Sequence, residues 1–488
     1  MTMVNHSTFV LEETTIADIQ NAIDRQELTS VQLVCLYLKQ ISLHNHRGSN
    51  INAVIEVNPD ALHIAESLDA ERLQKGKRGP LHGIPVLLKD NINTGDAIHT
   101  SAGSLALADS YADEDAFIAV KLREAGAIIL GKTNMTEWAN FMTENMPNGF
   151  SSRGGQVLNP YGPESFDVSG SSSGSGAAVA ANFAAAAIGT ETSGSILCPA
   201  SANSIVGIKP TTGLLSRFGI IPISSSQDTA GPMARTVTDA AILLGGMTGV
   251  DNRDPATHKS IHAFETDYTK HLKKTALNGA RIGVSYHFCT KELSSSEKER
   301  FDDSIEVIKQ QGCEIVIIDS ATPLEHVEWD YNVLLYEFKS GINHYLQQHT
   351  RLDSITSLKD IIAFNNANAA KCLRHGQVLL EESEKTSGTL TEFEYLENRM
   401  NDLRKSRELG IDKVIKEFQL DALLYPGDTG YGFSAKAGYP SISVPAGYDE
   451  NGRPIGIVFT SSAFKEPELI GFAYSFEQAT KHRVTPKL

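Results

Sequence analysis

Cysteine is scarce in this chain, and no two cysteines lie at the close spacing of a metal or redox site. The 488 residues include five, and no C-x-x-C pair occurs among Cys35, Cys198, Cys289, Cys313 and Cys372. The 15 histidines form no H-E-x-x-H run. These absences argue against a disulfide framework and against a structural or catalytic metal, so we expect neither a metal nor any other cofactor.

Positive charge and long apolar runs are also scarce. The 43 basic residues are outnumbered by 59 acidic ones, and the net charge of −16 disfavours binding to nucleic acid or to an anionic membrane. The longest apolar stretch, residues 177–189, is too short to span a bilayer and predicts a buried helix that runs into a strand. The first residues lack the features of a signal peptide. We therefore expect a cytoplasmic protein, and the sequence does not indicate an oligomeric state.

Short apolar runs alternate with helical segments along most of the chain, which predicts one α/β domain over residues 1–488. No Pro-rich linker or internal repeat interrupts the pattern. Thr15 and the Thr29-Ser30 pair are start signals for two helices near the N-terminus. The predicted parts are a helical N-terminal layer (1–78), a core (79–250), a helical insertion (323–418), and closing strands with a C-terminal helix (419–488).

Two Gly/Ser-rich loops carry the strongest functional signal. The first is SGSSSGSG, residues 169–176, and the second is GTETSGSILCPAS, residues 189–201. Glycine allows the backbone to approach a ligand closely, consecutive N–H groups can hold an oxyanion, and serine can supply a nucleophile. By composition alone, however, both loops could equally be flexible linkers or serine-capped turns.

These loops and three further segments resemble the amidase signature family. In chain order, the similar segments are GPLHGIPVLLKDNINT, GAIILGKTNMTEWANF, SGSSSGSGAAVAAN, GTETSGSI and VGIKPTTGLLSRFGIIPISSSQDTAGPMART. Weaker similarity continues to the C-terminus, and ETSGSILCPAS, SQDTAGPMAR and YEFKSGINHYL are similar to the peptide amidase branch. The resemblance implies a central twisted mixed β-sheet that is covered by α-helices on both faces.

The resemblance places a Ser-Ser-Lys triad on three residues of this chain. The family's lysine corresponds to Lys89, its bridging serine to Ser171, and its nucleophilic serine to Ser195, 24 residues further on. It also implies a cis peptide bond between Gly170 and Ser171. The implied reaction is hydrolysis of a linear carboxamide, such as a peptide C-terminal amide, to a carboxylate and ammonia through an acyl-enzyme on Ser195.

The loop around the nucleophile is implied to hold the oxyanion. Its donors are the backbone N–H groups of Thr192, Ser193, Gly194 and Ser195. The chain departs from the family here, because Ser193 stands where glycine is usual, and its side chain could narrow the acyl site or contact substrate. Ser169 and Ser173 also replace common glycines, which we expect to be tolerated.

The predicted roles set physical requirements on the triad. Lysine acts as a base only as the neutral amine, so Lys89 must lose contact with water, and the apolar run at residues 84–88 predicts that burial. A hydroxyl both donates and accepts, so Ser171 can pass a proton from Ser195 to Lys89.

Other residues of the similar segments have supporting roles. We interpret Glu191 and Asp228 as carboxylates that hold loops rather than as catalytic groups. Residues 133–153 and 323–440 are expected to line the substrate site, although the sequence does not orient their side chains.

Four other interpretations fit parts of the sequence. GSSSG at 170–174 matches the nucleophile elbow of an α/β-hydrolase with Ser172 as nucleophile, but no buried strand precedes it. GAIILGKT at 126–133 matches a phosphate loop, but its central residues themselves predict a strand. The glutamine-hydrolysing component of a tRNA-dependent amidotransferase would use the same triad on glutamine, yet no Tyr-Asp-Gly-x-Arg-like segment is present. A binding protein without activity is disfavoured because all three triad positions are filled.

Overall fold

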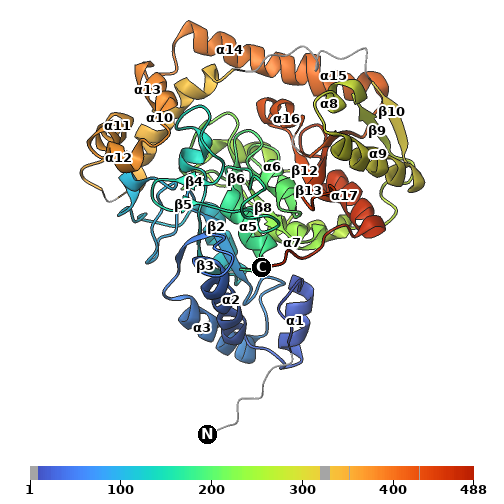
Figure 1. Ribbon diagram of the computed structural model, residues 1–488, viewed down its shortest axis with the longest axis horizontal. Coiled ribbons are helices and arrows are strands. Elements are labelled where there is room, and N and C mark those ends of the chain that lie inside the picture. The colour runs from blue at the N-terminus through green and yellow to red at the C-terminus, as the bar shows by residue number, and fades with distance from the viewer. Residues whose placement is uncertain (1–8, 319–329, 351, 428) are drawn as a thin grey trace.

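A mixed β-sheet of eleven strands runs through the part of the molecule that the computed structural model describes, residues 9–318, 330–350, 352–427 and 429–488 (Figure 1). The strand order is β1-β3-β2-β6-β8-β7-β12-β13-β11-β9-β10. The strands are β1 (Val54–Val57), β2 (Pro85–Lys89), β3 (Ile128–Thr133), β6 (Ala186–Glu191), β7 (Val206–Lys209), β8 (Thr229–Ala234), β9 (Arg281–Val284), β10 (Glu314–Ile317), β11 (Ala422–Pro426), β12 (Ser441–Tyr448) and β13 (Pro454–Thr460). A separate hairpin pairs β4 (Phe150–Ser151) with β5 (Gly155–Gln156).

The strands β2 and β6 position both Gly/Ser loops. β2 pairs in parallel with β3 on one side and with β6 on the other, so the carboxyl ends of these strands meet at one edge. β2 ends at Lys89, and β6 ends at Glu191, within the second loop. Every residue of both strands is buried, as expected for apolar runs between hydrogen-bonded neighbours under a cover of helices.

Helices cover this sheet, and the predicted fold class is confirmed. The first helices of the chain are α1 (Ile16–Asp24), α2 (Ser30–His44), α3 (Ala61–Lys75), α4 (Phe117–Glu124), α5 (Ser173–Ala180), α6 (Leu197–Ala202), α7 (Val237–Met247), α8 (Tyr286–Thr290) and α9 (Ser295–Gln310). They continue with α10 (Asn332–His349), α11 (Leu358–Ala367), α12 (Ala369–Cys372), α13 (Val378–Lys385), α14 (Phe393–Leu403), the π-helical η6 (Arg404–Ile411), α15 (Asp412–Phe418), α16 (Tyr431–Ala437) and α17 (Glu466–Thr480). Short 3₁₀ turns lie at η1 (Leu105–Leu107), η2 (Glu137–Asn140), η3 (Pro255–Ser260) and η4 (Tyr268–His271).

The N-terminal layer differs in one element from the prediction. Thr15 and Thr29 cap α1 and α2 with complete capping boxes, as predicted. The layer is not wholly helical, however, because Val54–Val57 form β1 and pair antiparallel with β3 at the edge of the sheet. Four residues between two helices are too few for periodicity to distinguish a strand from a helical turn.

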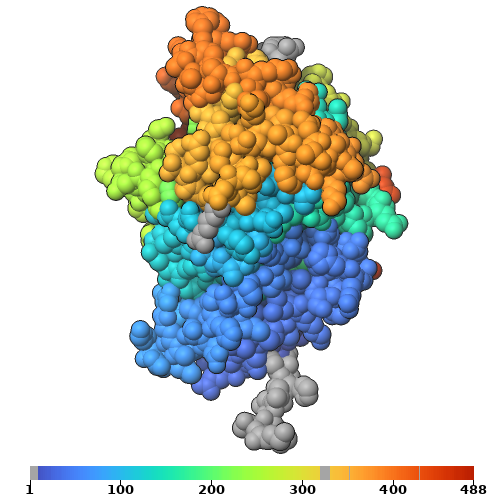
Figure 2. All heavy atoms as spheres, turned by 90° about the vertical axis from the view of Figure 1, so that its left-hand side faces the viewer, coloured from blue at the N-terminus to red at the C-terminus, as the bar shows by residue number. Residues whose placement is uncertain are grey.

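The helices α10 to α15 form a helical segment, and its part α10 to α13 lies over the residues leading to the first Gly/Ser loop (Figure 2). A hydrophobic cluster joins this helical segment to the residues that it covers. In it, the ring of Trp138 packs edge-on against Phe338 of α10. The beginning of the predicted helical insertion, residues 323–329, lies outside the described residues. The division of the chain into four parts of one domain stays a prediction.

No helix within the described ranges is long and apolar enough to cross a membrane. The apolar stretch 177–189 forms the end of α5 and the beginning of β6, as predicted, and both elements are buried.

Candidate active site

The side chain of Lys89 extends from the end of β2 to the first Gly/Ser loop. Its Nζ atom donates hydrogen bonds to Oγ of Ser171 at 2.8 Å and to Oγ of Ser172 at 2.9 Å. A third hydrogen bond, of 3.1 Å, goes to the carbonyl oxygen of Thr190 on β6. Neither Lys89 nor Ser171 has exposed surface. The structure therefore brings the predicted lysine and the predicted bridging serine into direct contact.

The burial of Lys89 changes its protonation. Loss of hydration disfavours the charged amine and lowers the pKa of Lys89 from 10.5 to about 7. The negative charges of Glu191 and Asp228 favour the charged form and limit this decrease. A large fraction of Lys89 is therefore neutral near pH 7, which is the form that can accept a proton.

The first Gly/Ser loop presents Ser171 immediately before α5. The peptide bond between Gly170 and Ser171 is cis, as the family resemblance implies. The carbonyl oxygen of Ser171 accepts a hydrogen bond of 3.1 Å from the backbone N–H of Thr136. A Cβ on Gly170 would lie 2.5 Å from Oγ1 of Thr136, so only glycine fits there. At the two variant positions, the hydroxyl of Ser173 donates to the backbone carbonyl oxygen of Ser169, and Ser169 itself has a φ of 59°, in the left-handed region that favours glycine.

Ser195 lies in the second loop, which is hydrogen-bonded to the first. The carbonyl oxygen of Ser195 accepts a hydrogen bond of 3.2 Å from the backbone N–H of Ser172. Ser195 keeps 7% of its surface exposed. Glu191 holds the start of α6, because its Oε2 accepts from the N–H groups of Ile196 and Leu197 at 2.7 and 3.0 Å. The geometry thus agrees with the interpretation of Glu191 as a carboxylate that holds a loop.

Thr192 is held through both its hydroxyl and its carbonyl group. Its Oγ1 donates to the carboxylate of Asp228 at 2.5 Å, and its carbonyl oxygen accepts from Nε2 of Gln227 at 3.1 Å. Asp228 also accepts from the N–H groups of residues 223–224 at 2.8 and 2.9 Å, and burial raises its pKa to about 6. These contacts fix the peptide between Thr192 and Ser193, whose N–H is a predicted oxyanion donor.

Ser193 and Gly194 differ in how much space surrounds them. Ser193 is exposed, so its side chain is tolerated within the loop. Gly194 is buried with a φ of 82°, in the left-handed region that favours glycine. A Cβ on Gly194 would lie 3.0 Å from Sγ of Cys198 and 3.1 Å from the ring of Tyr431 on α16. Glycine is therefore required at position 194 and dispensable at 193.

Ser172, the nucleophile of the alternative hydrolase elbow, serves the loop instead. It has no exposed surface. Its hydroxyl donates to the carbonyl oxygen of Thr190 at 3.0 Å and accepts hydrogen bonds from Lys89 and from the N–H of Thr190. A hydroxyl engaged by three partners is poorly placed to attack a substrate.

A cavity of about 270 Å³ lies beside the second loop. Thr190, Thr192 and Asp228 form part of its lining, together with Ala139 and residues of α10. Ala139 and the α10 residues belong to the regions 133–153 and 323–440, which the sequence predicts to line the substrate site. Much of the wall, however, comes from residues 217–225, which that prediction omits.

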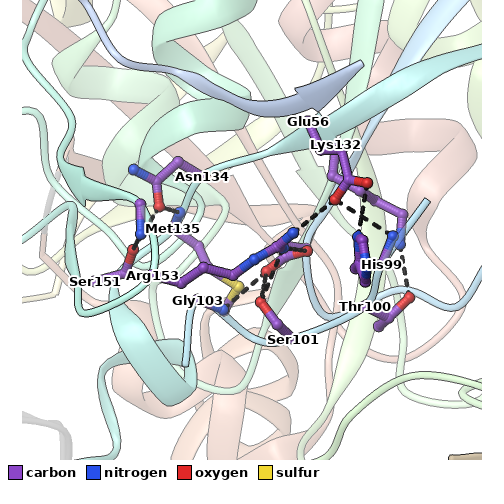
Figure 3. A network of polar contacts seen from close by, with 12 residues as sticks. Glu56, His99, Thr100, Ser101, Gly103, Lys132, Asn134, Met135, Ser151 and Arg153 are labelled. Carbon is purple, nitrogen blue, oxygen red and sulfur yellow. Dashed lines mark hydrogen bonds and ion pairs between the residues drawn. The ribbon is translucent and has the colours of Figure 1, made fainter. Parts of the chain in front are cut away.

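Asp90 directly follows β2 and is buried. It belongs to a polar network of which Figure 3 labels Glu56, Gly103 and Arg153. Its carboxylate accepts a hydrogen bond of 2.9 Å from the N–H of Gly103 and pairs with the guanidinium group of Arg153 at 3.4 Å. Arg153 also pairs with Glu56 of β1 at 2.6 Å. The network therefore ties the end of β2 to β1 and to the β4–β5 turn.

Residues 126–133 do not form a phosphate loop. Six of these eight residues, Ile128–Thr133, form the strand β3, as the sequence predicts. Lys132 has no exposed surface, and its Nζ donates to the carbonyl oxygen of Ile92 and to Oγ1 of Thr100, both at 2.7 Å. Its charge is thus directed to protein groups and not to a ligand.

The described part of the chain holds no group of three or more His, Cys, Asp or Glu side chains that could bind a metal ion. All five cysteines lie within the described residues, and none of them forms a disulfide bond there.

Comparison with known proteins assigns this architecture to a family. Residues 32–430 match the amidase family. A probable amidase of Arabidopsis thaliana is 43% identical over 99% of this chain and 93% of its own. The crystal structure of native peptide amidase from Stenotrophomonas maltophilia is 43% identical, with a TM-score of 0.91 over 98% of this chain and 99% of its own. A component of the glutamyl-tRNA(Gln) amidotransferase of Halorhodospira halophila is 31% identical over 98% of this chain and 99% of its own.

The chain belongs to the amidase family, and it is a hydrolase that acts on carbon–nitrogen bonds of linear amides. The predicted family and enzyme class are confirmed. Identity to the amidases exceeds identity to the amidotransferase component, which favours the amidase over the glutamine-hydrolysing alternative.

Proposed function

We propose that this amidase hydrolyses peptide C-terminal amides, with Ser195 as nucleophile, Ser171 as proton relay and Lys89 as base. The observation that carries the proposal is the 2.8 Å hydrogen bond between Lys89 and Ser171, both fully buried and joined to the loop of Ser195. A neutral lysine that contacts a serine relay can activate a second serine for acyl transfer.

In the proposed reaction, Lys89 accepts a proton from Ser171 while Ser171 accepts one from Ser195. Oγ of Ser195 attacks the amide carbonyl carbon, and the N–H groups of residues 192–195 donate to the oxygen on which negative charge develops. The proton returns through Ser171 to the leaving nitrogen, and ammonia departs from an ester on Ser195. Water then attacks the ester along the same proton path and releases the carboxylate. The reaction needs no cofactor.

Two observations support a peptide as substrate. The peptide amidase from Stenotrophomonas maltophilia is 43% identical over nearly the whole chain. The cavity beside Thr192 has Ile221 and Ile223 in its wall, which suit an apolar substrate side chain, and Arg217 and Asp254 offer polar contacts.

Ammonia release from peptide amides, fatty amides, aryl amides and free glutamine tests the proposal. We expect the wild type to prefer peptide amides and both Ser195→Ala and Lys89→Ala to abolish turnover. Lys385→Ala and Ser387→Ala, at exposed positions of the helical segment, are matched controls that should retain wild-type rates. A fluorophosphonate should label Ser195, and mass spectrometry of the peptide locates the adduct.

Three results would contradict parts of this proposal. Full activity of Ser195→Ala or Lys89→Ala would refute the triad. Turnover confined to glutamine would indicate the amidotransferase chemistry. Absence of both turnover and fluorophosphonate labelling would indicate a binding protein on an amidase scaffold.

A further inference from the structure

A buried carboxylate of the helical segment contacts the site region but has no part in the mechanism above. Glu337 lies on α10 and is 3% exposed. Its Oε2 accepts a hydrogen bond of 3.0 Å from the N–H of Ser226 and another from the hydroxyl of Ser224. Its Oε1 accepts from the hydroxyl of Tyr395 on α14 at 2.8 Å. The carboxylate therefore links α10 and α14 to the loop at residues 223–228.

Asp228 makes that loop a compact unit. The N–H groups of residues 223–224 donate to its carboxylate, and its own N–H donates to the carbonyl oxygen of Ser224 at 3.0 Å. The guanidinium group of Arg217 donates to the carbonyl oxygen of Ser225. Because these bonds close the loop on itself, a displacement of residues 224–226 must also move Asp228.

The other end of this unit acts on the predicted oxyanion hole. Asp228 accepts a hydrogen bond from the hydroxyl of Thr192, and Gln227 donates one to its carbonyl oxygen. Together they set the orientation of the peptide that carries the N–H of Ser193. An oxyanion donor must point at the position that the negative charge reaches in the transition state, and a misplacement of about 1 Å is costly.

We propose that Glu337 is a positioning residue for the oxyanion hole. It acts through the loop 223–228 on Thr192 and makes no contact with the nucleophile itself. The helical segment thereby becomes part of the catalytic arrangement as well as a cover for it. This inference rests on the proposed function, since it requires an oxyanion held by the second Gly/Ser loop.

Three variants of the full-length enzyme test the inference with a peptide amide as substrate. Glu337→Ala removes all three hydrogen bonds and should lower kcat about 10- to 100-fold, less than loss of a complete oxyanion donor, with KM changed less than about threefold. Glu337→Gln should restore most of kcat, because its amide oxygen can accept from Ser224 and Ser226 while its amino group donates to Tyr395. Tyr395→Phe leaves the loop contacts intact and should stay within about threefold of wild type.

Inhibitor affinity distinguishes positioning from general loosening. A peptide aldehyde forms a tetrahedral adduct with a nucleophilic serine, whereas the product peptide acid binds without one. We expect Glu337→Ala to weaken the aldehyde by the same factor by which kcat falls and to leave the affinity for the acid unchanged. Equal weakening of both ligands, or a wild-type kcat, would overturn the inference.

Ser224→Ala provides a second test should Glu337→Ala fail to fold. It removes the hydroxyl contact and leaves the bond between Glu337 and the N–H of Ser226, so the same pattern of effects should appear with smaller size. A wild-type kcat in this variant counts against the inference. The two proposals fail separately: activity in Ser195→Ala refutes the nucleophile, whereas an inactive Ser195→Ala with a fully active Glu337→Ala refutes only the positioning role.

Discussion

The Nζ atom of Lys89 lies 2.8 Å from Oγ of Ser171, and neither residue has exposed surface. The contact forms because β2 ends at Lys89 where the first Gly/Ser loop turns into α5. A fully charged amine at this place would lack hydration, and the desolvation of an ion costs several kcal/mol. The three contacts of Nζ match the three N–H groups of the charged amine. The neutral amine that burial favours keeps two N–H groups, and its lone pair can then accept a proton from Ser171.

The pH dependence of the reaction should report the pKa of Lys89. Below its pKa of about 7 the amine carries a proton and cannot act as a base, so kcat/KM should rise about tenfold per pH unit below pH 6 and level off above pH 8. The charge of Glu191 raises this pKa, so Glu191→Gln should move the rising limb to lower pH. Glu299→Gln, at an exposed side chain, should leave it in place. A flat profile between pH 5 and 9 would argue against Lys89 as the base.

The two serines beside Lys89 should differ in importance. Ser171→Ala removes the proposed relay and should lower kcat by about 10² to 10⁴, the usual range for a general acid–base contribution. Ser172→Ala removes a hydroxyl that holds the loop and carries no proton in the proposed reaction, so we expect kcat to fall roughly tenfold or less, while stability falls by about 0.5–1.5 kcal/mol per hydrogen bond lost. Ammonia release measures both. An inactive Ser172→Ala variant, together with fluorophosphonate labelling of Ser172 in the wild type, would instead support the hydrolase elbow.

Local sequence signals predict most of the fold. Thr15 and Thr29 cap α1 and α2, and the apolar run before Lys89 forms the buried strand β2. β1 escapes prediction because its four residues, Val54–Val57, are too short for a distinct periodicity, and its pairing partner β3 is distant in sequence. The pairing of a strand with another that is distant in sequence depends on the tertiary structure, so a short stretch of sequence does not predict it.

The active site likewise contains residues that the sequence predicts and residues that only the structure reveals. Lys89, Ser171 and Ser195 stand in ordered motifs that resemble a known family, so the sequence identifies them as candidates without a structure. Glu337 stands in YEFKSGINHYL, which resembles the peptide amidase branch, but that segment does not indicate its role. Ser224 lies 113 residues before it, and only the packing of α10 brings the two together. The space around Gly194 likewise depends on where α16 places Tyr431.

Gly194 should be intolerant of a side chain. Gly194→Ala places a Cβ in close contact with Cys198 and Tyr431 at a φ of 82°, where a non-glycine residue costs roughly 1–2 kcal/mol. The loop must shift to relieve the contact, so we expect kcat to fall at least about tenfold because the predicted oxyanion donors are displaced. Gly79→Ala is the matched control, since nothing lies within 4 Å of its added Cβ. Equal kcat in the two variants would contradict this account of the loop.

The network around Asp90 should matter for stability far more than an exposed ion pair. Arg153→Met leaves Asp90, which has no exposed surface, without its cation and should lower the free energy of unfolding by about 3–5 kcal/mol. Lys309→Met breaks an exposed pair with Glu306 and should cost about 0–1 kcal/mol. Urea denaturation measures both. Adding Asp90→Asn to Arg153→Met should recover part of the lost stability, because the buried charge is removed with its partner. Similar urea midpoints for Arg153→Met and Lys309→Met would show that the Arg153 pair contributes no more than a surface contact.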